Sequence, residues 1–218
     1  EYTLTDAIRR LSRVEKQRIA FLQGHGELER HAIYDIQLAL TDYYAMENIT
    51  LDGNINSLTE RVINPKDSTS ISFRNKFKLL VVPKPTKPFS DEDLYIIDQF
   101  VMYGGRVLWL IDGLDIEMDS LANRSQTMAM RMDLGLGFDE MMFTYGVRVN
   151  SNLIMDIRCM PVPMAGGSMG NNPQIEFRPW YYFPEIVPLS KHPIVKNLDV
   201  IKSEFVNGID IIDNEIRK

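Results

Sequence analysis

The chain has 218 residues, of which 44% are hydrophobic and 25% charged, as in an ordinary folded globular domain. Its net charge is −6 and no dense Lys/Arg cluster is present, which argues against a surface for nucleic acid or anionic membranes. The single cysteine excludes an internal disulfide framework, and no apolar run reaches the roughly 20 residues of a transmembrane helix.

The first part of the chain predicts two helices around a strand. A short amphipathic helix is expected from apolar residues at helical spacing: Leu4, Ile8, Leu11 and Val14. Residues 18–22 form a brief apolar run that predicts a strand ended by glycine. Residues 27–46 carry apolar side chains on one helical face and predict a long helix.

A second strand over residues 49–51 and a polar loop over residues 64–76 are expected next. The loop prediction rests on Pro65 and a Ser/Thr cluster.

A strand–helix–strand unit follows. Leu79–Val82 and Val107–Ile111 are both apolar on each face, which predicts neighbouring central strands of a parallel sheet. Between them, Ser90 is a suitable cap for a helix from Asp91 to about Tyr103, and its expected buried stripe is Leu94, Ile97 and Val101. Two glycines suit the end of this helix.

The second half is less regular. Residues 115–136 are methionine-rich and weakly patterned, and residues 138–145 predict a short helix. Residues 147–162 and 174–183 predict the two strands of a long hairpin around a Gly/Asn-rich loop.

The predicted fold class is therefore α/β, with a Rossmann-like or flavodoxin-like, mostly parallel sheet flanked by helices and a β-rich C-terminal elaboration. We expect residues 1–145 to form the core and residues 146–218 to be an elaboration packed on the same domain.

The candidate site begins with Gly24, His25, Gly26 and Glu27, at the junction of the first strand and the helix expected after it. Glycines there allow close approach of a ligand, although the same residues also serve as an ordinary tight turn with Glu27 near the positive end of a helix dipole. Loops at the carboxyl ends of parallel strands lie on one edge of a sheet, so these residues are expected near Pro85, Thr86, Lys87 and Asp112, with His25 partly exposed.

Other chemistry has weaker support. His25, Glu27 and His31 are too few to form a zinc site without further ligands, so neither a metal nor a cofactor is predicted. Cys159 lies away from any strand–helix turn of the G-x-[SC]-x-G type, and a structural thiol is the interpretation. Asp112 is either a strand-end ligand group or the cap of a turn, and the stretch RPWYYFP (178–184) is either an exposed aromatic surface or core.

Several segments together resemble one family. The run LLVVPKPTKPFSDEDLYIIDQFVMYGGRVLWLIDG (79–113), the early GHGE, YGVRVNSNLIMD (145–156) and KHPIVKNLD (191–199) resemble the GldG-type proteins. These are auxiliary subunits of ABC transporters associated with bacterial gliding motility, and the resemblance spans nearly the whole chain.

The resemblance implies a Rossmann-like domain on the outer side of the cytoplasmic membrane, partnered by the permease subunit of an ABC transporter. It also implies membrane spans outside this chain, in keeping with a sequence that begins at Glu1 rather than Met. The expected function is non-enzymatic, with a carbohydrate or other small ligand at the strand-end rim and no nucleic acid as partner. The alternative is a small-molecule hydrolase or carbohydrate-active enzyme that uses Glu27, His25 and Asp112.

Overall fold

The computed structural model describes residues 4, 5, 7, 8, 15–64, 67–114, 116, 118, 137–169 and 172–213. The chain divides into two compact units, the first formed by Glu1–Ile111 with Leu134–Tyr145 and the second by Asp112–Asp133 with Gly146–Lys218. The predicted location of residues 146–218 against the same domain as residues 1–145 stays a prediction. Leu4 and Ile8 are helical and exposed, whereas Leu11, Val14 and most of the methionine-rich stretch lie outside the described residues.

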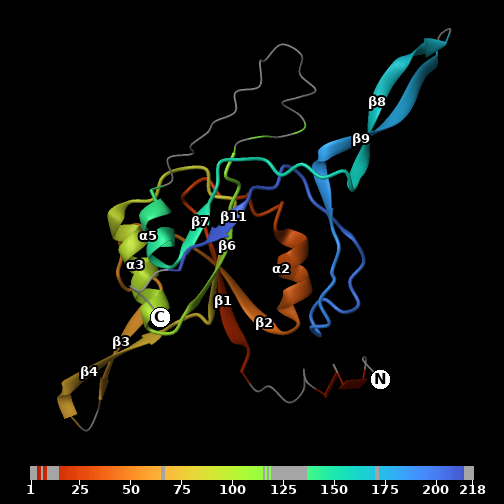
Figure 1. Cartoon of the computed structure of the whole chain (residues 1–218). Helices are drawn as coiled ribbons and strands as arrows, with labels where there is room; N and C mark the ends of the chain where they lie inside the picture. Colours follow the sequence, from red (N-terminus) through yellow and green to blue (C-terminus); the bar gives the residue numbers. More distant parts are fainter. Residues whose placement is uncertain are drawn as a thin grey trace. The chain divides into compact units, whose positions relative to one another are not determined.

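A parallel sheet of four strands organises the first unit (Figure 1). Its order is β2-β1-β5-β6, and each neighbouring pair is parallel. The strands are β1 (Gln17–Leu22), β2 (Tyr44–Ile49), β5 (Leu79–Pro83) and β6 (Arg106–Leu110). With antiparallel strands added towards the C-terminus, the predicted mixed α/β class is confirmed.

One face of the sheet packs against helix α3 (Asp91–Met102). Ser90 caps this helix as predicted, and its buried apolar residues are Ile96, Ile97 and Phe100. Of the three residues expected to form the buried stripe, Ile97 is buried, whereas Leu94 and Val101 are only half-buried. The helix α5 (Asp139–Thr144), predicted over residues 138–145, contributes Met142 to the same core.

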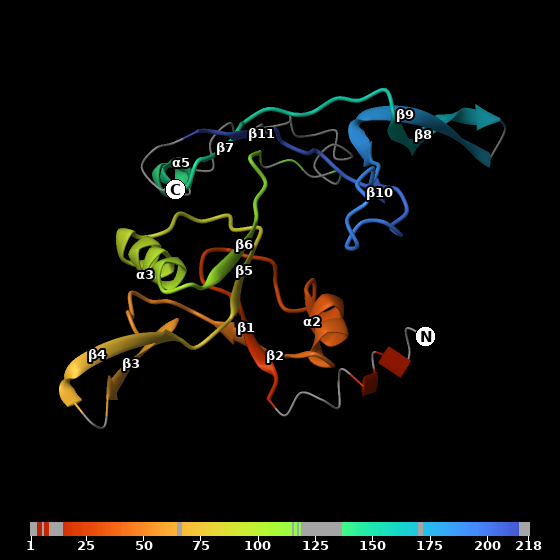
Figure 2. The same cartoon turned by 60° about the horizontal axis from the view of Figure 1, so that its bottom comes forward.

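The opposite face carries a smaller core of Ile19, Phe21, Ile33 and Val81. Helix α2 (Tyr34–Thr41) lies on this side, away from α3 and α5 (Figures 1 and 2). The prediction of a long helix over residues 27–46 was wrong: α2 has only 8 residues, and the chain enters the sheet again at Tyr44, as strand β2. None of the residues of α2 is buried.

The strand β6 corrects a second expectation. It is parallel to β5 as predicted, but it lies at the edge of the sheet rather than in its centre. Leu108 and Leu110 are 45% and 48% exposed. In the described part of this unit α3 packs against β6, whereas α2 packs against β2 at the other edge.

An antiparallel hairpin replaces the loop predicted over residues 64–76. Its strands are β3 (Thr59–Asn64) and β4 (Asp67–Asn75), and their register shifts at Ile63/Asn64. The hairpin projects from the sheet (Figure 2), so polar side chains can occupy both of its faces. Polarity was therefore no sign of a loop here.

The second unit is made of short antiparallel pairs and one long hairpin. The hairpin pairs β8 (Cys159–Met169) with β9 (Asn172–Ile186), and β10 (Ile201–Lys202) adds to β9. A hairpin was predicted here, but the bounds of its first strand, residues 147–162, were wrong: β8 begins only at Cys159 and continues into the Gly/Asn-rich stretch that was expected to be the loop. β7 (Val147–Val149) pairs with β11 (Ile209–Ile211).

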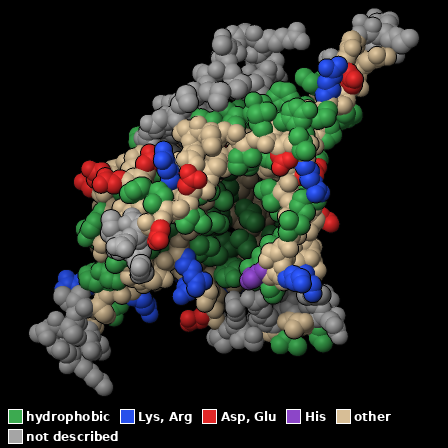
Figure 3. All heavy atoms as spheres, viewed as in Figure 1, with side chains coloured by type: hydrophobic (Ala, Val, Ile, Leu, Met, Phe, Trp, Pro, Cys, Tyr) green, Lys and Arg blue, Asp and Glu red, His purple; other side chains and the backbone are tan. Residues whose placement is uncertain are grey.

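No helix in the described residues is long and apolar enough to cross a membrane. On the face drawn in Figure 3, Lys and Arg side chains are interspersed with Asp and Glu.

Candidate functional site

Two loops at the carboxyl ends of neighbouring strands are bonded to each other. The His25 carbonyl, after β1, accepts hydrogen bonds from the backbone N–H groups of Thr86 (2.9 Å) and Lys87 (2.8 Å), after β5. The Thr86 hydroxyl donates to the Gly26 carbonyl at 2.9 Å. Gly26 has φ +71°, and a Cβ there would lie 2.2 Å from Thr86 Oγ1, so only glycine permits this approach. The structure thus brings together two of the three predicted segments.

The His25 side chain is held by two carboxylates and an aromatic ring. Its Nε2 lies 3.1 Å from Asp93 Oδ2, and its Nδ1 lies 3.3 Å from Glu27 Oε1. The Phe89 ring stacks on the imidazole at a centroid distance of 4.0 Å. His25 is therefore only 8% exposed, and the expectation of a partly exposed ring was wrong.

The two carboxylates are themselves anchored by backbone groups. Glu27 Oε2 accepts from the His25 N–H at 2.7 Å, and Asp93 Oδ1 accepts from the Gly53 N–H at 3.0 Å. The Asp93 N–H donates in turn to the Ser90 hydroxyl at 3.1 Å, which is the helix cap. We call His25, Glu27 and Asp93 the His25 clasp, because it ties the loops after β1, β2 and β5 together.

Charge pairing dominates the electrostatics of the clasp. Burial by itself would lower the pKa of His25, but the hydrogen bonds and charges of Glu27 and Asp93 outweigh burial and raise it above the usual 6.5. Burial would likewise raise the pKa of Glu27, but the interactions with His25 and two backbone N–H groups lower it. The pKa of Asp93 is lowered, against burial, by Gly53, Ser90 and His25. The clasp thus favours an imidazolium between two carboxylates.

This arrangement suits a structural role better than proton transfer or metal binding. The imidazole is buried and each of its nitrogens faces a carboxylate, so neither nitrogen is open to a substrate or a metal ion. The two carboxylates contact opposite nitrogens of the ring, so the three side chains do not face a common point. Within the described residues, no group of three or more His, Cys, Asp or Glu side chains could hold a metal ion.

The clasp lies where ligands collect in open α/β sheets. After β1, the chain adds β2 on one side of it and then β5 and β6 on the other side. The strand order therefore reverses between β1 and β5. Crevices at such a reversal, outside the carboxyl ends, are frequent ligand sites. In this chain His25 and Phe89 fill the position beneath the joined loops, which leaves the loop surfaces for contact.

The outer surface of these loops is formed by other predicted residues. Gly24, Thr86 and Lys87 are exposed, while Pro85 is fully buried. Asp112 follows the end of β6 and falls in the second unit, so its expected place beside these loops stays a prediction. The acidic partner that completes the clasp is Asp93, which the sequence indicated only as part of a helix start.

The remaining candidates lie elsewhere. His31 is exposed and pairs with Glu29 (3.3 Å), so it does not join Glu27 at a metal site. Cys159 is a half-buried free thiol at the start of β8. In the stretch RPWYYFP, Phe183 is buried against Phe205 and Tyr181 is 48% exposed, so both alternatives hold in part.

Comparison with known proteins identifies the family. Residues 16–218 match a family described as an ABC-type uncharacterized transport system. The chain belongs to this family. It is accordingly an auxiliary component of an ABC-type transport system, and its partners include membrane-embedded transporter subunits.

Comparison with curated proteins gives no match. Among solved structures, the family member described here is similar to the mmIFT52 N-terminal domain, with 10% identity and a TM-score of 0.50 over 90% of this chain and 69% of the other. At that identity the likeness concerns the fold alone.

Proposed function

We propose that this chain is a non-enzymatic domain that works on the outer side of the cytoplasmic membrane, as the resemblance to GldG-type gliding-motility proteins implies. Membrane spans outside the chain anchor it beside the permease subunit. The rim formed by Gly24, Thr86 and Lys87 contacts the permease or a small ligand such as a carbohydrate.

The observation that carries this proposal is the closed state of the clasp. Both imidazole nitrogens face carboxylates, and Phe89 covers the ring. A general base must lie within reach of its substrate, and the ring of His25 is buried, with Nδ1 3.3 Å from Glu27 Oε1 and Nε2 3.1 Å from Asp93 Oδ2. The clasp instead holds the two rim loops in a fixed relation, and a rigid, exposed loop surface is what a docking site requires.

Changes at the rim test the docking role. Lys87→Glu reverses an exposed charge without touching the clasp, and Lys196→Glu is the matched change on an exposed lysine of the second unit. In cells that produce the full-length protein, we expect Lys87→Glu to reduce co-purification of the permease and Lys196→Glu to leave it unchanged. Equal recovery with both variants would contradict the docking role.

The location has its own test. Lys191→Cys in a Cys159→Ala background gives this chain a single, exposed thiol, and the Cys159→Ala protein without Lys191→Cys is the control for thiols elsewhere. We expect a membrane-impermeant maleimide to label this thiol in intact cells as fully as in lysed cells. Labelling only after lysis would place the domain in the cytoplasm and refute the proposed location.

Hydrolysis is the competing function, and it makes an opposite prediction. A hydrolase that uses His25 and Glu27 would lose its activity in Glu27→Gln while Lys87→Glu stayed active. Release of reducing sugar or ester hydrolysis by the purified chain, abolished in Glu27→Gln, would overturn the non-enzymatic proposal.

A further inference from the structure

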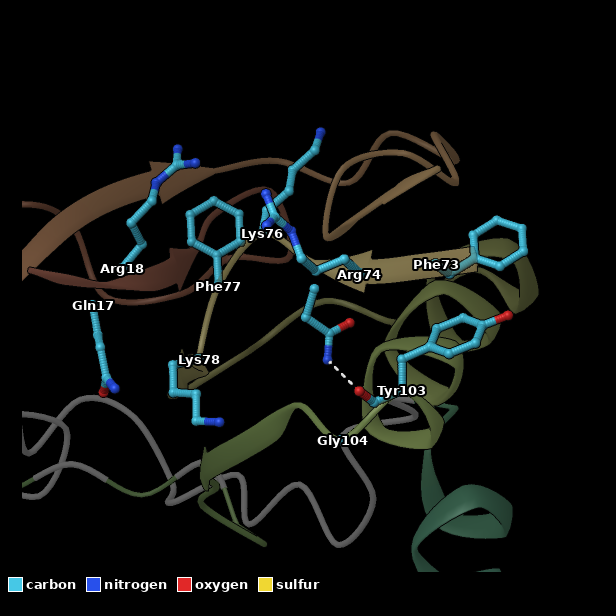
Figure 4. Close-up of a pocket in the computed structure, with 10 residues that line it drawn as sticks. Gln17, Arg18, Phe73, Arg74, Lys76, Phe77, Lys78, Tyr103 and Gly104 are labelled. Atoms are coloured by element: carbon cyan, nitrogen blue, oxygen red, sulfur yellow. Dashed lines mark hydrogen bonds between the residues drawn. The ribbon is translucent and has the colours of Figure 1, made fainter. Parts of the chain in front are cut away.

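A second concave site lies at the opposite edge of the same sheet. A cavity of about 360 Å³ is lined by residues at the starts of the parallel strands, among them Arg18 on β1 and Lys78 just before β5 (Figure 4). The end of β4 and the turn after α3 complete its wall. Cavities of this size hold small organic molecules.

The lining is strongly cationic. Four of its ten residues are Lys or Arg and none is Asp or Glu, in a chain whose net charge is −6. They are Arg18, Arg74, Lys76 and Lys78. In Figure 4 the first three extend on the same side of the strand ends as the ring of Phe77, whereas Lys78 extends to the other side.

Neighbouring acids neutralise only part of this charge. Arg18 pairs with Glu47, and Arg74 pairs with Glu60. Lys76 donates to the Asn56 carbonyl, which carries no charge, and the Lys78 ammonium has no hydrogen-bond or ion-pair partner in the described residues. Two positive charges are left over. A phosphate monoester carries about −1.5 to −2 at neutral pH, which matches them better than a single carboxylate does.

The cavity also offers a surface for an organic group. The rings of Phe73 and Tyr103 stack at a centroid distance of 5.2 Å, and they are 44% and 42% exposed. Arg18 lies over the Phe77 ring at 4.9 Å, which leaves several of its N–H donors available. Exposed aromatic rings beside cationic donors suit a molecule with a phosphate at one end and a ring or sugar at the other.

We infer that this cavity, formed by Arg18, Arg74, Lys76, Lys78, Phe73 and Tyr103, binds the phosphate group of a phosphorylated organic molecule. The site is separate from the His25 clasp and from the rim, and it does not depend on the proposed docking role. The same phosphate chemistry occurs in soluble phosphate esters and in lipid headgroups, and the two sources are separated below.

Calorimetric titration of the purified chain tests the site. Glucose 6-phosphate is expected to bind and glucose is not. Lys78→Ala removes an exposed, unpartnered ammonium and should weaken glucose 6-phosphate binding by about tenfold or more, because a charged hydrogen-bond donor is lost. Lys76→Ala should weaken it similarly. Lys196→Ala, an exposed lysine outside the cavity, should bind as the unmodified chain does.

A second arm uses vesicles with and without phosphatidic acid. Binding to phosphatidic acid vesicles without binding of glucose 6-phosphate, lost in Lys78→Ala, would support the site and assign the phosphate to a lipid. The inference is overturned if neither phosphate probe binds, if glucose binds as well as its phosphate, or if Lys78→Ala binds as tightly as Lys196→Ala. Equal melting temperatures of the variants establish that a loss of binding is not a loss of fold.

Discussion

His25 lies between two buried carboxylates, those of Glu27 and Asp93. The sequence predicted a partly exposed ring, and replacing an exposed side chain usually changes stability little. The ring is instead buried and pairs with both carboxylates, and Glu27 and Asp93 are only 9% and 7% exposed. Its removal leaves those charges without their counter-ion, which the low dielectric of the interior penalises.

We therefore predict that His25→Ala lowers the free energy of unfolding by about 3 kcal/mol, the order expected when a buried ion pair loses one partner. His31→Ala is the matched control, since His31 is exposed and pairs only with Glu29. Urea denaturation measures both variants. A loss no larger for His25→Ala than for His31→Ala would refute the clasp.

Stability should depend on pH through the same residue. Because the pKa of His25 is raised on folding, its stabilisation is present below about pH 6.5 and is lost as the pH rises through the higher folded value. The pKa values of Glu27 and Asp93 are lowered, so their stabilisation is lost as the pH falls below about 4 and passes through the folded values.

Melting temperatures measured from pH 4 to 9 should thus fall on the alkaline side, and this decline should be absent in His25→Gln, whose side chain does not titrate. An alkaline decline of equal size in His25→Gln would assign the effect to other groups.

Cys159 gives a simple prediction at the same scale. The thiol is free and half-buried, and no base is found beside it in sequence. Cys159→Ala should unfold at nearly the same urea concentration as the unmodified chain and retain permease binding. Rapid modification of Cys159 by a thiol reagent at neutral pH, which indicates a reactive thiolate, would argue for a functional cysteine.

The helices and strands whose signals lie close together in the sequence were predicted well. The apolar run of β5 and the Ser90 cap of α3 are local signals, and each lies where it was expected. Helix α2 and strand β2 were misjudged, because the apolar spacing of residues 27–46 fits a helix while Tyr44–Ile49 pairs along β1. That pairing is a tertiary interaction, which helical spacing does not reveal.

The cap of α3 links the helix to the site. Ser90→Ala removes the acceptor of the Asp93 N–H and should lower the free energy of unfolding by about 1 kcal/mol, the usual effect of losing a helix cap. Ser151→Ala, at an exposed serine of the second unit, should leave stability unchanged. Urea denaturation of the two variants decides, and equal midpoints would show that the cap contributes nothing.

For the whole molecule, the sequence predicted that the loops after β1 and β5 would meet, because parallel neighbouring strands deliver them to one edge. It did not reveal Asp93 as the partner of His25. In the motif S-x-x-D the acid is expected to support its own helix, and only the folded loop brings His25 to it. The cationic cavity was equally hidden, since its residues come from separate elements at the amino ends of the strands.

We expect the rim of this transport-system domain to contact the permease on the outer side of the cytoplasmic membrane. Site-specific photocrosslinking tests it most directly, with a photoreactive residue replacing Lys87, or Lys196 as control, in the full-length protein of living cells. The account predicts a crosslink to the permease from position 87 and a much weaker one from position 196. Crosslinks from position 87 to cytoplasmic proteins alone, or equal permease crosslinks from both positions, would contradict it.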